Sequence, residues 1–182
     1  ATLAAFATDA AAQNYPTRPV TIVVPYAAGG NTDMIARDLG RRLEARLGQS
    51  VVIEQKLGAA SVIGANYVAR SAPDGHTLLL GTSTTMAINV SVYKNLPYDP
   101  TRDLVPVALV AGVPFMLVVN PALPIRSIQD FVAAAKATPG GLSYASNGAG
   151  GAAHLFAELI KVTLGIEMTH VPYKGLAPAL ND

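Results

Sequence analysis

The strongest constraint on the fold is a regular alternation of short apolar runs with amphipathic helical segments. Three β-branched or leucine-rich runs lie at residues 20–24, 51–55 and 77–81. Two segments with helical periodicity lie between them, at residues 32–47 and 62–71, and Gly48 ends the first. Continuous apolar runs are typical of strands that are buried on both faces. The order therefore predicts a parallel sheet with helices on both faces and right-handed crossovers.

The second half of the chain repeats this alternation after a proline-marked boundary. Apolar runs at residues 105–110 and 114–119 are expected to be further strands, and the stretch NPALPIRS follows them. A helix is expected to start after Ser127, because Ser127 and Asp130 have the spacing of a capping box. A strand at 142–146, a helix at 151–164 and a strand at 168–173 complete the pattern. Two domains are therefore predicted, at residues 13–121 and 122–182.

Composition excludes several classes of protein. Hydrophobic residues make up 51% of the chain and charged residues 14%, which excludes a disordered chain. The net charge of +1, the scattered Lys and Arg and the absence of Trp argue against a nucleic-acid partner. Cysteine is absent, so disulfides, thiolate metal sites and a cysteine nucleophile are excluded. No run of about 18 apolar residues marks a membrane span.

Residues 1–12 (ATLAAFATDAAA) differ from the rest of the chain. Their weakly apolar, Ala-rich body ends in an A-x-A cleavage pattern at Ala10–Ala12, which is typical of the end of a secretory signal peptide. An Ala-rich leader or an expression remnant is the alternative, and Asp9 counts in its favour. The signal-peptide interpretation predicts a soluble protein exported to the periplasm, with a mature chain that starts near Gln13.

Three loops follow predicted strands and combine glycines or hydroxyls with a helix start. They are Tyr26–Asn31 (YAAGGN), Thr82–Thr85 (TSTT) and Ser146–Gly151 (SNGAGG). Ligands bind at the carboxyl ends of parallel strands, and glycine-rich helix starts offer backbone N–H groups and a partial positive charge. These features suit a carboxylate, phosphate or sulfate. For any one of these loops, glycines that only allow the chain to turn are a better explanation than a ligand site. The three loops together favour a ligand site.

A dinucleotide site is the main alternative for the third loop. Gly148-x-Gly150-x-x-Ala153 fits the relaxed G-x-G-x-x-A pattern between a strand and a helix. That motif expects an acidic residue at the end of the next strand, whereas Glu167 stands at its start. A P-loop motif is absent. A nucleotide-dependent enzyme that uses this loop therefore stays open as the second hypothesis.

Metal binding and catalysis find little support in the sequence. His154 and Glu158 share a helical face, but no third ligand stands near them. His154 is instead expected to hydrogen-bond its own loop, and His170 is expected to be a strand residue. No nucleophile, base and orienting group come together. The sequence therefore predicts no catalytic residues, no metal and no cofactor.

The motifs as a group resemble the Bug family, the periplasmic receptors of tripartite tricarboxylate transporters. The resemblance is carried by Val20–Tyr93 and by the stretches LPYDPTRDLVPVALV, SYASNGAGGAAHLFAELI and HVPYKGLAPALND, in that order. It covers residues 15–182. It departs in GAASVIG, where the family usually has a further glycine, and in EQKLG, where the family often has Glu-Asn-Arg.

The resemblance implies an α/β receptor like the type II periplasmic binding proteins, two-lobed as a Venus flytrap, with mainly parallel sheets. Family members continue further, so residues 13–121 are expected to be the first lobe and residues 122–182 the start of an incomplete second lobe. Such a receptor captures a small carboxylate-bearing organic acid between its lobes and delivers it to a membrane permease. The acid could be a mono- or dicarboxylate, an amino acid or an aromatic acid. It would not be an enzyme.

Carried over residue by residue, the resemblance implies a binding site with contributions from both lobes. The first lobe would supply Tyr26, Ala28, Gly29, Gly30, Asn31, Asp33, Thr82 and Ser83. The second lobe would supply Ser146, Asn147, Gly148, Ala149, Gly150, Gly151 and His154.

Overall fold

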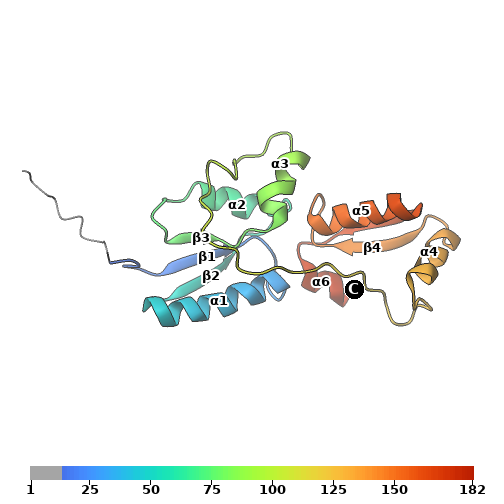
Figure 1. Cartoon of the computed structure of the whole chain (residues 1–182), viewed down its shortest axis with the longest axis horizontal. Helices are drawn as coiled ribbons and strands as arrows, with labels where there is room; N and C mark the ends of the chain where they lie inside the picture. Colours follow the sequence, from blue (N-terminus) through green and yellow to red (C-terminus); the bar gives the residue numbers. More distant parts are fainter. Residues whose placement is uncertain (1–13) are drawn as a thin grey trace, which may run out of the picture.

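The computed structural model, which describes residues 14–182, has two α/β lobes that lie end to end (Figure 1). The expected signal-peptide remnant at residues 1–12 lies outside the described residues. The first lobe contains β1 (Val20–Val24), α1 (Asn31–Leu47), β2 (Val51–Gln55), α2 (Val62–Ala69) and β3 (Thr77–Leu79). Its sheet has the order β2-β1-β3, and β1 pairs in parallel with both neighbours. The predicted parallel sheet is therefore confirmed.

The two faces of β1 account for the position of the helices. Ile22 and Val24 are buried on one face, where Ala36 of α1 packs against them. Val62 and Ala65 of α2 form a second cluster with Leu79 of β3. Figure 1 shows α1 and α2 on opposite sides of the sheet, as right-handed crossovers require. Gly48 ends α1 in a left-handed conformation, with φ of 67°.

A short helical region that the sequence did not predict follows β3. A π-helical turn at Thr84–Ile88 leads directly into α3 (Asn89–Val92). The polar TSTT stretch is therefore partly helical. Thr85 and Asn89 are fully buried in it, and their side chains form hydrogen bonds inside the first lobe.

The expected strands at residues 105–110 and 114–119 are not formed. This segment is extended but unpaired, and it connects the first lobe to the second. Val105 is 87% exposed and Leu109 is 94% exposed. Strand propensity becomes a strand only when a neighbouring strand supplies ladder hydrogen bonds, and no described strand lies beside this segment.

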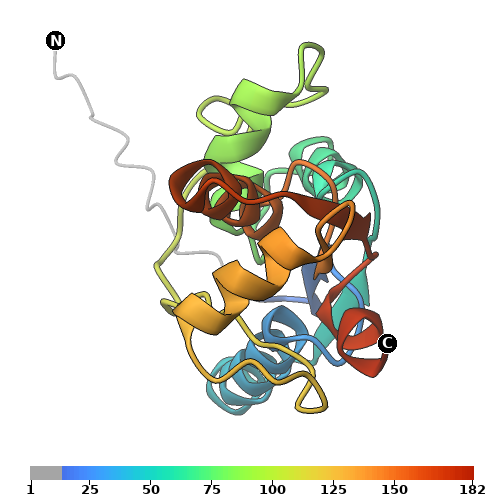
Figure 2. The ribbon, with the colours of Figure 1, turned by 90° about the vertical axis from the view of Figure 1, so that its right-hand side faces the viewer.

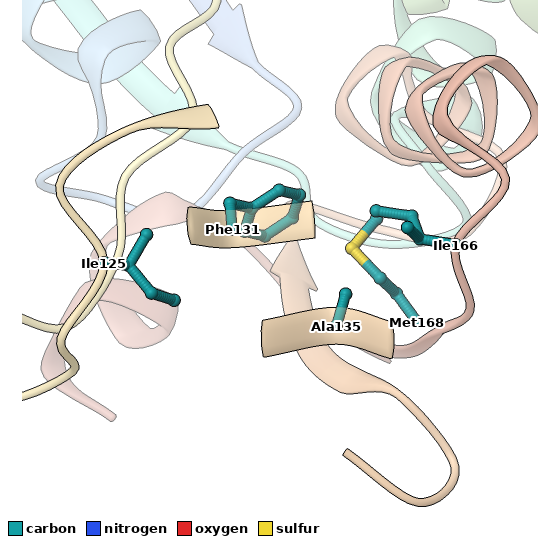
Figure 3. Packing of buried hydrophobic residues seen from close by; sticks show 5 residues of the cluster. All are labelled: Ile125, Phe131, Ala135, Ile166 and Met168. Atoms are coloured by element: carbon teal, nitrogen blue, oxygen red, sulfur yellow. The ribbon is translucent and has the colours of Figure 1, made fainter. Parts of the chain in front are cut away.

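The second lobe contains α4 (Ile128–Ala137), β4 (Leu142–Ser146), α5 (Ala152–Leu164), β5 (Met168–Pro172) and α6 (Leu176–Asn181). Strands β4 and β5 pair in parallel. Figure 2 views this lobe from outside, with α4 in front and α6 beside it near the C-terminus. Its core joins Ile125, Phe131, Ala135, Ile166 and Met168, which converge from α4, β5 and the flanking loops (Figure 3).

The start of α4 is capped as the sequence predicted, with one difference. The Asp130 amide donates to the Ser127 hydroxyl over 3.1 Å. The Asp130 carboxylate accepts from the amide of Arg126 at 3.0 Å, one residue before the position that a standard capping box uses. Both bonds fix the direction in which the chain enters the second lobe.

The described part of the chain contains no helix that is both long and apolar enough to cross a membrane. The division between residues 121 and 122 stays a prediction. The two sheets lie on either side of it, with the extended connection at residues 105–124 between them.

Candidate functional site

A cavity of about 250 Å³ lies between the lobes, at the carboxyl ends of their parallel strands. From the first lobe it is lined by Pro25, Tyr26, the loop Gly58–Ser61 and Tyr93. From the second lobe it is lined by Asn147–Ala149 and Pro172–Lys174. Pockets for drug-sized ligands hold about 300–1,000 Å³, so this volume suits a smaller molecule.

Small residues let the two lobes touch around this cavity. A Cβ atom on Gly175 would lie 2.6 Å from the Cβ of Ala27, and one on Gly150 would lie 3.0 Å from Val92. Gly148 also faces Ala60 across the cavity, where a Cβ would be 3.7 Å from the Ala60 Cα. The two lobes are therefore in contact around the cavity.

The predicted first-lobe loop lies at the start of α1, and only part of it reaches the cavity. Tyr26 lines the cavity, whereas Ala28, Gly29, Gly30 and Asn31 do not. Gly29 is close to α6, since a Cβ there would be 3.6 Å from the Cβ of Ala177. The loop therefore forms one wall of the contact between lobes.

Asp33 has a structural role in this wall. Its carboxylate is 3% exposed and accepts from the Gly29 amide at 3.0 Å, from Arg37 Nε at 2.9 Å and from Gln55 Nε2 at 2.7 Å. Burial would raise the pKa of Asp33, but the bonds from Arg37, Gly29 and Gln55 outweigh it and lower the pKa below its usual value. Asp33 thus fixes the Gly29 turn through internal hydrogen bonds.

The hydroxyl loop after β3 does not line the cavity, but it contacts Tyr26, which does. The hydroxyls of Tyr26 and Thr82 lie 2.8 Å apart, and the Thr82 amide donates to Thr85 Oγ1 at 3.3 Å. Ser83 is exposed at the start of the π-helical turn. Thr84 reaches the other lobe, where its Oγ1 accepts from the Ala152 amide at 3.1 Å.

Three backbone amides of the second-lobe loop Ser146–Gly151 donate hydrogen bonds within the second lobe. The amides of Gly148, Gly150 and Gly151 donate to Ser146 Oγ, His154 Nδ1 and Gly148 O at 3.2, 3.1 and 3.3 Å. The expected bond of His154 to its own loop is therefore confirmed. Of the predicted residues here, Asn147, Gly148 and Ala149 line the cavity. The buried Asn147 Oδ1 has no partner among the described residues, so it can accept from a ligand or water.

The loop Gly58–Ser61, which was not among the predicted site residues, lines the cavity opposite Gly148. Ala59, Ala60 and Ser61 have positive φ angles of 46°, 47° and 77°. Such conformations cost about 1–3 kcal/mol each in a residue other than glycine and cluster at functional sites. The loop follows the carboxyl end of β2, so the rule that identified the other loops applies to it equally.

Buried polar side chains hold this strained loop in place. Asn89 Nδ2 donates to the Ala60 carbonyl at 3.0 Å, and the Ser61 hydroxyl lies 2.9 Å from that of Thr85. The Tyr98 hydroxyl donates to the Thr85 carbonyl at 2.7 Å. The π-helical turn and α3 therefore hold the cavity-lining loop Gly58–Ser61 in its conformation.

Lys174 is the charged residue among those that line the cavity, and no Asp or Glu joins it there. It follows β5, beyond the three loops that the sequence singled out. A single cation in a cleft without acidic groups favours an anionic guest. The sequence signal for Lys174 was its position just past the carboxyl end of a strand.

A larger hollow, of about 620 Å³, lies outside the cleft against α1 and β2. Arg37, Arg41 and Glu44 line it, and no residue of the loops at the carboxyl ends of the strands does. The cleft is therefore the better candidate. No group of three potential metal ligands occurs among residues 14–182, and His154 Nε2 lies 3.8 Å from Glu158 Oε1.

Comparison with known proteins agrees with this arrangement. The family model for the tripartite tricarboxylate transporter family receptor matches residues 35–182. Protein BugT of Bordetella pertussis is 43% identical over 180 residues, which are 98% of this chain and 55% of BugT. The chain spans about half the length of the curated relatives it matches.

Two related proteins with the same fold have been solved with a bound ligand. Rpa4515 of R. palustris, solved with adipate, is 44% identical with a TM-score of 0.89, over 92% of this chain and 56% of that one. MatC from Rhodopseudomonas palustris, solved with bound malate, is 36% identical with a TM-score of 0.85, over 92% and 57% of the two chains.

Two α/β lobes with mainly parallel sheets, which face each other through their strand-end loops, match part of the two-lobed fold of the periplasmic binding proteins. The chain belongs to the tripartite tricarboxylate transporter receptor family, as the match over residues 35–182 shows. Members of this family are periplasmic solute-binding receptors and not enzymes. The dinucleotide hypothesis for Gly148-x-Gly150 is accordingly set aside.

Proposed function

We propose that this chain belongs to an exported receptor that captures a small carboxylate-bearing organic acid between its lobes and delivers it to a membrane permease. The observation that carries the proposal is the cleft, in which strand-end loops and Lys174 meet without an acidic side chain. The adipate and malate bound to structural neighbours support a carboxylate.

The binding site is proposed to comprise the cavity-lining residues and the adjoining predicted loops. One carboxylate of the ligand would accept hydrogen bonds near Asn147 and Ala149. The charge of Lys174 would attract a second carboxylate of the same ligand. Closure over the acid would follow the Venus-flytrap scheme, because the glycine contacts between the lobes form only when the lobes meet.

Binding of dicarboxylates to the full chain tests the proposal. Adipate or malate at about 100 times its dissociation constant should stabilise the protein by ~2.7 kcal/mol in thermal unfolding. Adipamide, the neutral diamide of adipate, should have no effect. A full chain that responds to no organic acid across a screen of mono- and dicarboxylates, amino acids and aromatic acids would contradict the proposal.

A pair of lysine variants locates the site. Lys174→Gln should weaken dicarboxylate binding by about tenfold, since a charge-assisted hydrogen bond contributes about 1.5–3 kcal/mol. Lys136→Gln, in the exposed last turn of α4, is the matched control and should bind as the natural chain does. Equal affinities of the two variants would place the ligand away from Lys174.

A further inference from the structure

Two histidines stack on one another behind the second-lobe loop. The rings of His154 from α5 and His170 from β5 lie 4.0 Å apart between centroids, with an angle of 13° between their planes. Tyr144 of β4 stacks on His170 at 5.0 Å. Neither histidine lines the cavity, so the proposed function alone gives the pair no role.

Each ring holds one end of the loop that closes on the ligand. His154 Nδ1 accepts from the Gly150 amide at 3.1 Å. His170 Nε2 lies 2.6 Å from the hydroxyl of Ser146, which is 2% exposed. That hydroxyl also bonds the amide and the carbonyl of Gly148, so both ends of Ser146–Gly151 depend on the pair.

The bond to Gly150 requires a neutral His154. An imidazole nitrogen accepts a hydrogen bond only when it carries no proton, and protonation makes both ring nitrogens donors. A proton on Nδ1 would therefore replace the bond to Gly150 with two opposed N–H groups. It would also place a positive charge against the second ring of the stack.

A proton on the pair would meet one opposite charge, because Glu158 Oε1 lies 3.8 Å from His154 Nε2. Tyr144 from β4 and Glu158 and Lys161 from α5 are the titratable groups that face the pair. Glu158 already accepts from the Tyr144 hydroxyl at 2.9 Å and from Lys161 Nζ at 3.1 Å. Burial, reinforced by His154 and Lys161, lowers the pKa of His170 below its usual value, although Glu158 acts in the opposite direction.

We propose that His154 and His170 are positioning residues for Ser146–Gly151 and that this loop keeps its binding conformation only while the His154 ring is neutral, so that the receptor releases its ligand in mild acid. This inference rests on the proposed function. The lowered pKa of His170 favours a neutral ring stacked against His154. Binding is therefore expected at neutral pH and is lost when a proton on His154 breaks the bond to Gly150.

Calorimetric titration of the full chain with adipate, from about pH 8 to pH 5, tests the inference. The dissociation constant should be constant above about pH 7 and rise by up to tenfold per pH unit in the acid range. In the double variant His154→Asn/His170→Gln, amide groups replace the ring nitrogens that make the two bonds. The double variant should bind adipate near neutral pH. Its dissociation constant should change much less with pH, and only through any protonation of adipate itself. His76→Gln, in the first lobe, is the control and should keep the natural profile.

Nuclear magnetic resonance of the ligand-free chain separates this inference from the proposed function. The Gly150 amide resonance should shift when a proton on Nδ1 of His154 removes the acceptor of its hydrogen bond, and the amide should then lose protection from exchange. A steady Gly150 signal across the pH range of the calorimetric titration, or equal acid weakening in the natural and double-variant chains, would overturn the positioning role. A Gly150 signal that titrates in a chain that binds no acid would refute only the proposed function.

Discussion

Gly150 and Gly30, one from each Gly-rich loop, differ in backbone conformation and in the space around them. Gly150 has φ of 75°, and a Cβ there would press on Val92 of the first lobe. Gly30 has φ of −78°, which any residue adopts, and its Cβ would meet only the Ala27 carbonyl oxygen at 3.6 Å. The sequence shows two similar Gly-rich helix starts, but of these two positions only Gly150 has a conformation that favours glycine.

Alanine at these two positions gives a matched pair of variants. Gly150→Ala should weaken adipate binding by about tenfold, since a left-handed alanine costs about 1–2 kcal/mol and its methyl group obstructs closure. Gly30→Ala should bind within about twofold of the natural chain, because its Cβ makes an ordinary contact. Calorimetry measures both affinities, and circular dichroism confirms folding. Equal losses in the two variants would show that the Gly150 contact between the lobes does not control closure.

Among the elements, the extended segment at residues 105–119 departs most from its local sequence. Val105, Val107 and Leu109 alternate as they would along a strand, and each is more than 80% exposed. An exposed apolar segment of high strand propensity with unpaired backbone groups is a template for pairing with another chain. The α5 face that carries Leu155, Leu159 and Val162 is exposed as well.

A polypeptide of these 182 residues expressed alone should therefore self-associate. Val107→Lys should shift it toward monomer, because a charge on a free strand opposes pairing. Met34→Lys changes an exposed apolar residue of α1 in the same way and should leave the association unchanged. Sedimentation velocity over a range of concentrations measures both. A polypeptide that is monomeric at every concentration would contradict this expectation.

Across the two lobes, one hydrogen bond stands out among the described residues. The Ala152 amide donates to Thr84 Oγ1, and Thr84 is 4% exposed. It joins the π-helical turn of the first lobe to the first turn of α5. Because Ala152 N–H is one of the helix-end donors without an intrahelical partner, Thr84 caps a helix of the other lobe when the lobes are closed.

Removal of this acceptor should favour the open receptor. Thr84→Val keeps the side-chain shape but leaves the Ala152 amide buried and unpaired, at a cost of about 1–3 kcal/mol. Adipate should dissociate about tenfold faster from this variant, as measured by stopped flow. Thr101→Val removes a hydroxyl that bonds only Asp99 in its own lobe, and it should leave the dissociation rate unchanged. An unchanged rate in Thr84→Val would mean that the bond does not hold the lobes together.

Local patterns were enough to predict most of the scaffold. The strands at 20–24, 51–55 and 142–146 have the predicted bounds, and Gly48 and Ser127 act at the ends of α1 and α4 as expected. These features depend on side-chain periodicity and on hydrogen bonds between near neighbours in the chain. The sequence also indicated that the candidate site lies at the strand ends, since that rule follows from parallel topology.

Contacts between distant residues determined the rest. Residues 105–119 have the propensity of strands but lack a neighbour, and the loop Gly58–Ser61 keeps its left-handed angles through Asn89 and Thr85. The stack of His154 on His170 joins residues that are separate in the sequence. Propensity describes what a segment favours in isolation, whereas strand pairing, strain and stacking depend on which partner the folded chain brings within reach.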